Sequence, residues 1–126
     1  MNDRVKSLNV VQYVTESLIK LGIKANLRGF CYIKEAIIIY PEVLYHNKTI
    51  KDIYAEIAET YNTNVISVER AIRTAIESAW YSNNINLSHD LFNFPYIIAE
   101  RNPTNSELIA AMSEIIFMKT KPCCHN

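Results

Sequence analysis

The chain has 126 residues and a mass of 14.5 kDa, a size that suits one domain and leaves little room for a second. Thirteen basic residues balance thirteen acidic ones. The formal net charge of zero excludes a protein held on nucleic acid by bulk charge alone. Only two glycines and four prolines are present, too few for the many turns of a β-sandwich or barrel. The composition therefore favours helices.

The sequence predicts neither a secretory signal nor a membrane-spanning segment. Its N-terminus runs directly into an amphipathic stretch, and the longest apolar run, residues 36–40, is far too short to cross a bilayer. The three cysteines, Cys31, Cys123 and Cys124, have no framework spacing and suit a reducing compartment. We therefore expect a cytoplasmic protein.

Two helices are predicted in the first third of the chain. Apolar residues at spacings of three and four predict the first over residues 5–21, ended by Gly22. The second is predicted from about residue 26 to residue 40, where Pro41 follows. The β-branched run at residues 37–39 also fits a strand, although no partner strand is evident.

The next two predicted helices form a helix-turn-helix candidate over about residues 50–81. Thr49 opens the first with a capping box, and the polar residues 61–64 separate it from the second, which covers residues 65–81. Ala58 is small enough for the helix crossing, and Asn62 tolerates the positive φ that such a turn requires. The apolar residues expected to lock the pair are Ile57, Tyr61, Val68 and Ala71.

The rest of the chain is less regular until a second capping box. Residues 85–101 are predicted as a short helix or packed loop, and Thr104 with Glu107 opens a last helix. Residues from about 119 to 126 are predicted as a frayed tail. We therefore expect an all-α fold, a compact bundle of about five or six helices in one domain over residues 1–126.

The outward face of the helix at residues 65–81 carries the side chains suited to reading bases. An arginine can bond guanine O6 and N7 together, which discriminates by about 1–3 kcal/mol. A glutamate nearby accepts from a cytosine amino group or orients the arginine. Glu69 lies four residues before Arg73, so the two can pair in the absence of DNA. An ordinary solvated helix face remains the alternative. The residues of this face are Glu69, Arg70, Arg73, Thr74 and Glu77.

Other chemistry finds little support in the sequence. No Gly-rich phosphate loop, nucleophile elbow or paired-carboxylate motif is present, so we expect neither an enzyme nor a cofactor. Cys123, Cys124 and His125 are metal-ligating residue types but have no second half-site, so we expect no metal. Trp80 is expected in the core.

Several separated segments resemble one family in the same order along the chain. They are residues 22–37 (GIKANLRGFCYIKEAI), residues 68–73 (VERAIR) with 75–77 (AIE) and 79–80 (AW), residues 84–85 (NI), and residues 102–107 (NPTNSE). Together they make residues 23–118 similar to the C-terminal DNA-binding domain of the stage-zero sporulation protein A family, the sporulation master response regulator of Firmicutes. The resemblance implies a six-helix all-α domain that binds a short promoter element as tandem copies.

The resemblance also implies roles for individual residues. The positions of Glu69, Arg70 and Arg73 face the DNA bases in this family. The stretch matching residues 85–94 lies where the family contacts the RNA polymerase sigma factor, which implies that role for Leu87, Leu91 and Phe92.

Phosphate contacts are expected from polar residues next to the recognition helix. Thr63, Asn64 and Ser67 stand at its predicted N-terminal end, and Arg28, beside Gly29, is a further candidate, for which a solvated cap residue is the alternative.

The chain departs from the family pattern in ways that weaken phosphate binding. Glu59, Thr60 and Ser67 stand where the family usually has basic residues, and Thr74 stands where it usually has histidine. Each lost basic residue removes one phosphate contact and lowers the salt slope by about one. The length also leaves no room for the receiver domain with its phosphorylated aspartate.

Two functions follow as hypotheses. The first is a sequence-specific DNA-binding transcription regulator related to sporulation control, acting through double-stranded promoter DNA. The alternative is an interaction module without a receiver domain that modulates a full-length regulator or a sigma factor. The acidic segment over residues 81–114 favours this alternative.

Overall fold

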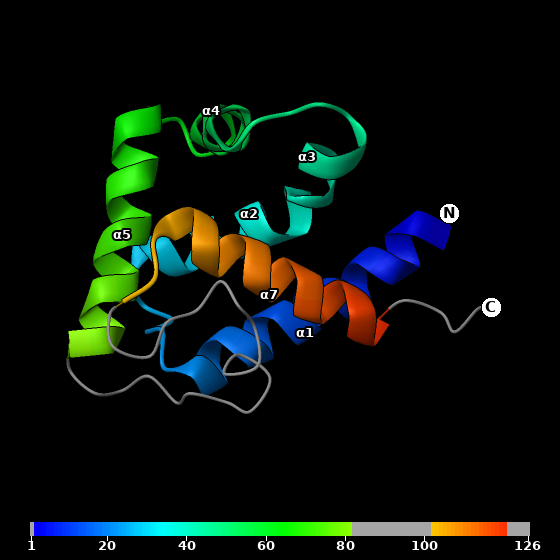
Figure 1. Cartoon of the computed structure of the whole chain (residues 1–126), viewed down its shortest axis with the longest axis horizontal. Helices are drawn as coiled ribbons and strands as arrows, with labels where there is room; N and C mark the ends of the chain where they lie inside the picture. Colours follow the sequence, from blue (N-terminus) through cyan, green and yellow to red (C-terminus); the bar gives the residue numbers. More distant parts are fainter. Residues whose placement is uncertain (1, 82–101, 121–126) are drawn as a thin grey trace.

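Within residues 2–81 and 102–120, which the computed structural model describes, all regular structure is helical. The helices are α1 (Asn2–Leu21), α2 (Arg28–Ile39), α3 (Pro41–Tyr45), α4 (Ile50–Thr60), α5 (Val65–Tyr81) and α7 (Asn105–Thr120). Helix α2 contacts each of the other described helices, so they pack as one bundle around it (Figure 1). The predicted all-α class is confirmed, and the strand alternative at residues 37–39 is wrong.

Helix α1 ends in a backbone motif that glycine makes possible. The Gly22 N–H donates to the Ile19 carbonyl at 3.1 Å, and the Ile23 N–H donates to the Leu18 carbonyl at 3.1 Å. These bonds satisfy two of the carbonyls that a helix end leaves without partners. Gly22 has a φ of 104°, which other residues rarely adopt. The predicted end of this helix is confirmed, although α1 begins three residues earlier than expected.

Helix α2 lies at the centre of the bundle because its buried face is apolar and includes a glycine, Gly29, at which another helix can approach closely. A Cβ atom at Gly29 would overlap the Ala71 carbonyl oxygen and lie 2.7 Å from the Ala75 Cβ, both on α5. The backbone of α2 therefore touches α5 directly. The buried residues of α2 are Gly29, Phe30, Tyr32, Ile33, Ala36 and Ile37.

The predicted second helix, about residues 26–40, is confirmed with bounds one or two residues shorter at each end, and a further short helix follows it from Pro41. Helix α2 ends at Ile39, and Pro41 begins α3, a five-residue helix that the sequence did not predict. Proline has no N–H to donate to the carbonyl four residues earlier, which belongs to Ile37. The Ser113 hydroxyl of α7 donates to that carbonyl instead, over 3.3 Å. Ser113 is the one polar side chain that is buried among the described residues.

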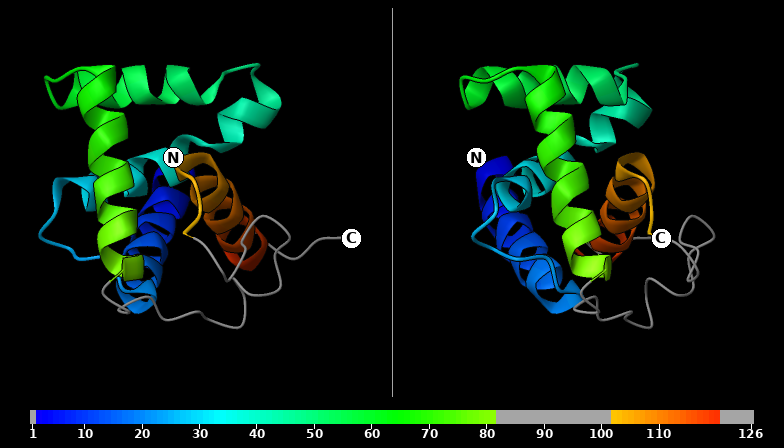
Figure 2. Two further views of the ribbon diagram at one scale, coloured as in Figure 1. Left: turned by 60° about the vertical axis from the view of Figure 1, so that its left-hand side comes forward. Right: turned by 90° about the vertical axis from the view of Figure 1, so that its left-hand side faces the viewer.

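Helix α4 and the start of α5 meet at one end of the bundle. Helix α4 runs crosswise to α5, at the end opposite the C-terminal ends of α1 and α5 (Figure 2). Their bounds agree with the predicted helix-turn-helix limits of residues 50 and 81. Helix α7 continues through Thr120, whereas a frayed tail was expected from about residue 119. Residues 85–101 and 121–126 lie outside the described residues.

The contact at Gly29 gives a first testable prediction. We expect Gly29→Ala to lower the free energy of unfolding by about 1–3 kcal/mol, because the added methyl group overlaps the backbone of α5. Urea denaturation followed by circular dichroism measures the change. Thr74→Ala, at an exposed position of α5, is the control and should stay within about 0.5 kcal/mol of the parent chain. Equal stability of both variants would contradict the close helix contact.

Candidate nucleic-acid interface

A four-residue turn joins α4 to α5 and fixes the direction in which α5 leaves. The Thr63 N–H donates to the Ala58 carbonyl at 2.8 Å, and the Asn62 N–H donates to the Glu59 carbonyl at 3.4 Å. Asn62 adopts a φ of 57°, so the prediction that it supplies the left-handed turn residue is confirmed. The turn repeats the motif that ends α1, with asparagine in the place of glycine.

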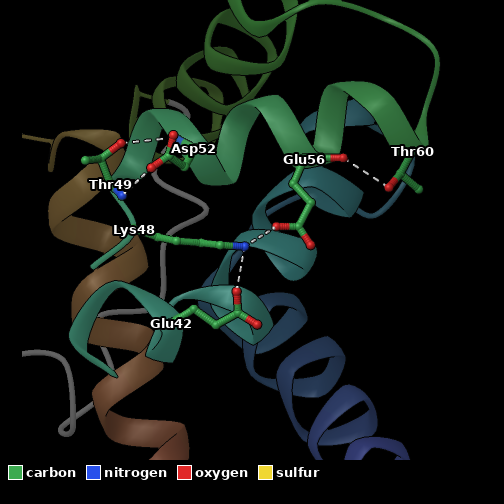
Figure 3. Close-up of polar contacts among 6 residues, drawn as sticks. All are labelled: Glu42, Lys48, Thr49, Asp52, Glu56 and Thr60. Carbon is green, nitrogen blue, oxygen red and sulfur yellow. Dashed lines mark hydrogen bonds and ion pairs between the residues drawn. The ribbon is translucent and has the colours of Figure 1, made fainter. Parts of the chain in front are cut away.

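Side chains cap the N-termini of both helices of the pair. At α4, the Thr49 hydroxyl accepts from the Asp52 N–H at 3.1 Å, and the Asp52 carboxylate accepts from the Thr49 N–H at 2.9 Å (Figure 3). The predicted capping box is thus confirmed. At α5, the Asn64 side-chain oxygen accepts from the Ser67 N–H at 2.8 Å. Asn64 therefore holds the helix start, and its amide N–H groups stay available for a phosphate.

Three of the four residues expected to lock the pair do face the bundle. Ile57 and Val68 are buried, and Ala71 is half-buried. Tyr61 was expected in the same role, but it is 40% exposed. That prediction is wrong because its partners are on α2.

Tyr61 instead fastens the turn to α2. Its ring meets the Tyr32 ring edge-on with centroids 5.3 Å apart, and its hydroxyl donates to the Glu35 carboxylate at 3.1 Å. Partial burial and the negative charge of Glu35 raise the pKa of Tyr61 to about 12. The hydroxyl therefore stays protonated and bonded throughout the neutral range.

The outer face of α5 presents the three residues that the sequence predicted as base-contacting. Arg70 and Arg73 are exposed and Glu69 is half-buried. The Arg73 guanidinium lies 3.0 Å from the Glu69 carboxylate, so the predicted pairing of these two residues is confirmed. Each of these two side chains keeps 46% of its surface exposed, which leaves the pair open to a ligand from outside.

Helix α7 holds α5 at the same point. The Asn105 amide, at the start of α7, donates to the backbone carbonyl of Glu69 at 3.1 Å. Asn105 also hydrogen-bonds the hydroxyl of Tyr54 on α4, whose pKa is raised by burial. One side chain thus joins α4, α5 and α7. This role of Asn105 could not be predicted from the sequence, because no spacing rule links a helix start to a residue 36 positions away.

A hollow of about 590 Å³ opens beside this junction. It lies where the starts of α4 and α7 meet the side of α5, and it contains the Glu69–Arg73 pair. Its lining mixes charged side chains with apolar ones, among them Ile50, Val65 and Pro103. Its polar lining residues include Lys51, Glu69, Arg73, Asn105 and Ser106.

The structure brings some of the predicted phosphate-contacting residues together. Arg28, the exposed first residue of α2, lines a hollow of about 390 Å³ with Thr63 of the turn. Asn64 and Ser67 are exposed at the start of α5. These residues flank the N-terminal end of α5. The residues predicted to contact a sigma factor, Leu87, Leu91 and Phe92, lie outside the described part of the chain.

The charge on the helix pair is unfavourable for tight phosphate binding. Residues 50–81 contain three basic and five acidic residues. Lys48 offsets part of this charge from outside the pair, since its ammonium lies 2.8 Å from Glu42 and 3.1 Å from Glu56 (Figure 3). The hydrogen bond to Lys48 lowers the pKa of Glu42, and bonds to both carboxylates raise the pKa of Lys48.

Neither a metal site nor a membrane span is found in residues 2–81 and 102–120. No three histidine, cysteine, aspartate or glutamate side chains converge there to hold an ion. No helix in those ranges combines the length and the hydropathy that crossing a bilayer requires. Cys123, Cys124 and His125 lie outside the described residues. Cys31 is a free thiol, and Trp80 is partly buried against the core, as expected.

The left-handed conformation at Asn62 predicts the effect of two substitutions. Asn62→Gly should preserve or raise stability, because glycine adopts positive φ without steric cost. Asn62→Ala should lower the free energy of unfolding by about 1 kcal/mol, because an ordinary side chain clashes in this conformation. Urea denaturation distinguishes the two variants. An alanine variant as stable as the glycine variant would contradict the turn geometry.

The Tyr61–Glu35 bond predicts a stability change at alkaline pH. The pKa of Tyr61 is about 12 in the folded chain against an ordinary 10.0, so unfolding becomes easier as pH rises from 10 to 12. Below pH 10, the contribution of the bond is fully present. We expect Tyr61→Phe to be less stable than the parent chain at pH 8 and to approach it by pH 12. Thermal melts across this range, with Tyr45→Phe at an exposed site as the control, measure the difference.

Comparison with known families agrees with this geometry. Residues 14–116 match the family model described as the sporulation initiation factor Spo0A C terminal. The match extends from α1 to α7 and includes the whole α4–α5 pair. This family is a DNA-binding effector domain of a sporulation regulator and not an enzyme family. The chain belongs to the Spo0A C-terminal domain family.

Proposed function

We propose that this protein is a sequence-specific, DNA-binding transcription regulator related to sporulation control, with α5 as the recognition helix in the major groove. The observation that carries the proposal is the exposure of Arg70 and Arg73 on the outer face of α5. A helix pair with a tight turn presents its second helix to the groove in this way. Membership of a DNA-binding family supports the same role.

Base reading begins when Arg73 exchanges its partner in the free protein, Glu69, for a guanine. In the free protein, the Glu69 carboxylate holds the Arg73 guanidinium at 3.0 Å. In the groove, guanine O6 and N7 replace that carboxylate contact, while Arg70 reads a second guanine from the same face. Glu69 then accepts from a cytosine amino group or keeps Arg73 oriented. Because the guanidinium is already ordered, less side-chain entropy is lost on binding.

Phosphate contacts fix the register of α5 on the duplex. Thr63, Asn64 and Ser67 flank the start of α5, and Arg28 approaches the same strand from α2. Arg28 is the one cation among these four residues. The affinity for DNA is therefore moderate, and it depends only weakly on salt concentration. The protein acts in the cytoplasm, where promoter DNA is found.

Two further elements of the proposal concern assembly on the promoter. Tandem copies of the protein occupy adjacent elements, and Leu87, Leu91 and Phe92 contact the sigma factor of RNA polymerase. Both rest on the family resemblance. The competing hypothesis, an interaction module without DNA binding, rests on the acidic segment over residues 81–114, and no contact among the described residues favours it.

The test is selection of a binding site from random duplexes, followed by fluorescence anisotropy on the selected and a scrambled duplex at two salt concentrations. The parent chain should prefer the selected site. Arg73→Ala should lose that preference, by about tenfold or more in the ratio of dissociation constants, because its guanine contact is gone.

Arg28→Ala is the matched control for charge. Removing this arginine should weaken binding to both duplexes about equally and lower the salt slope by about one, because a phosphate contact carries no sequence information. An Arg73→Ala variant that discriminates as well as the parent chain would overturn the assignment of base reading to this residue.

A further inference from the structure

Ile66 stands on the face of α5 that the arginines occupy, although its side chain is apolar. It is the second residue of the helix and is 64% exposed. Ile66, Arg70 and Arg73 follow one another at spacings of four and three, so they form one row along the helix. The buried residues of α5, which are Val68, Ile72, Ala75, Ile76 and Ala79, lie on the opposite side.

The exposure of Ile66 is not a requirement of the fold. The neighbouring Val65 is partly buried against the core, and the α5 N-terminus is already capped by Asn64. A serine or threonine at position 66 would expose less apolar surface to water at no cost in packing. Single exposed apolar side chains are common on protein surfaces, and Ile19 is another in this chain, so it is the place of Ile66 in line with Arg70 and Arg73 that points to a ligand.

The major groove offers one apolar feature to a side chain in this position. Of the four bases, only thymine carries a methyl group on its groove edge. In helix-turn-helix proteins the N-terminal residues of the recognition helix lie nearest the base edges, and Ile66 belongs to the first turn. One helical turn advances about 5.4 Å, between one and two base-pair steps, so Ile66 and Arg70 reach nearby bases.

We propose that Ile66 determines specificity by packing against the 5-methyl group of a thymine, within two base pairs of the guanine that Arg70 reads. This inference rests on the proposed DNA-binding function. It adds Ile66 to Arg70 and Arg73 as a third base-contacting residue in the row, which we call the recognition row. The apolar contact excludes water from the methyl group and favours thymine over cytosine, which has no methyl group there.

The experiment removes only the methyl group from the DNA. Starting from the selected duplex, each thymine is replaced in turn by deoxyuridine, and binding is measured by anisotropy. One replacement near the Arg70 guanine should weaken binding of the parent chain by about fourfold, the effect of one buried methyl group. The same replacement should leave the affinity of Ile66→Ala unchanged, because the variant has already lost the contact.

Ile19→Ala is the matched control, since Ile19 is 54% exposed on α1 and away from the recognition row. It should respond to deoxyuridine as the parent chain does. The inference falls if no replacement affects the parent chain, or if Ile66→Ala remains as sensitive as the parent. A parent chain that selects no sequence at all would overturn the proposed function as well, so the two failures are distinguishable.

Discussion

The direct contact between α2 and α5 at Gly29 sets the position of α5, the proposed recognition helix. A side chain there would overlap the Ala71 carbonyl, so the two backbones can approach only because the residue has none. Ala71 and Ala75 are the facing residues on α5, and both are small. Burial of one face of α5 against α2 leaves the opposite face, with Arg70 and Arg73, available for DNA. The contact with α2 thus fixes the direction in which the exposed face of α5 points.

Three further contacts hold the same helix, each at a different place. Asn64 caps its start, Tyr61 fastens the preceding turn to Glu35 of α2, and Asn105 of α7 binds the carbonyl of Glu69. Helix α5 is therefore restrained at its first turn, at the turn before it and at Glu69, beside the proposed base-contacting arginines. Such restraint suits a reader of base edges, because a displaced side chain loses its bidentate geometry.

Local signals in the sequence were sufficient for the ends of most helices. The capping boxes at Thr49 and Thr104, the stop at Gly22 and the left-handed Asn62 each depend on residues within one turn of helix. Helix α3 was missed because five residues are too few to show an apolar period.

Contacts between segments that are far apart in the chain could not be predicted from such local signals. Tyr61 occupies an apolar position in the helical period, so it was expected between α4 and α5, but its partners are Tyr32 and Glu35. In the sequence, Asn105 is an ordinary residue after a helix cap, and only the fold places it next to Glu69. For the candidate site, the pattern of α5 was enough to place Glu69, Arg70 and Arg73 on one face. The role of Asn64 in capping needed the structure.

The bond between Ser113 and the Ile37 carbonyl couples two positions that are far apart in the chain. Pro41 removes the N–H that would have served this carbonyl, and Ser113 replaces it from α7. The two residues consequently constrain each other during divergence. A lineage that replaces Pro41 with a residue bearing an N–H frees position 113 to become alanine, whereas the loss of Ser113 while Pro41 persists strands a carbonyl in the core. The residue at 113 therefore compensates for the residue at 41, although the two lie on different helices.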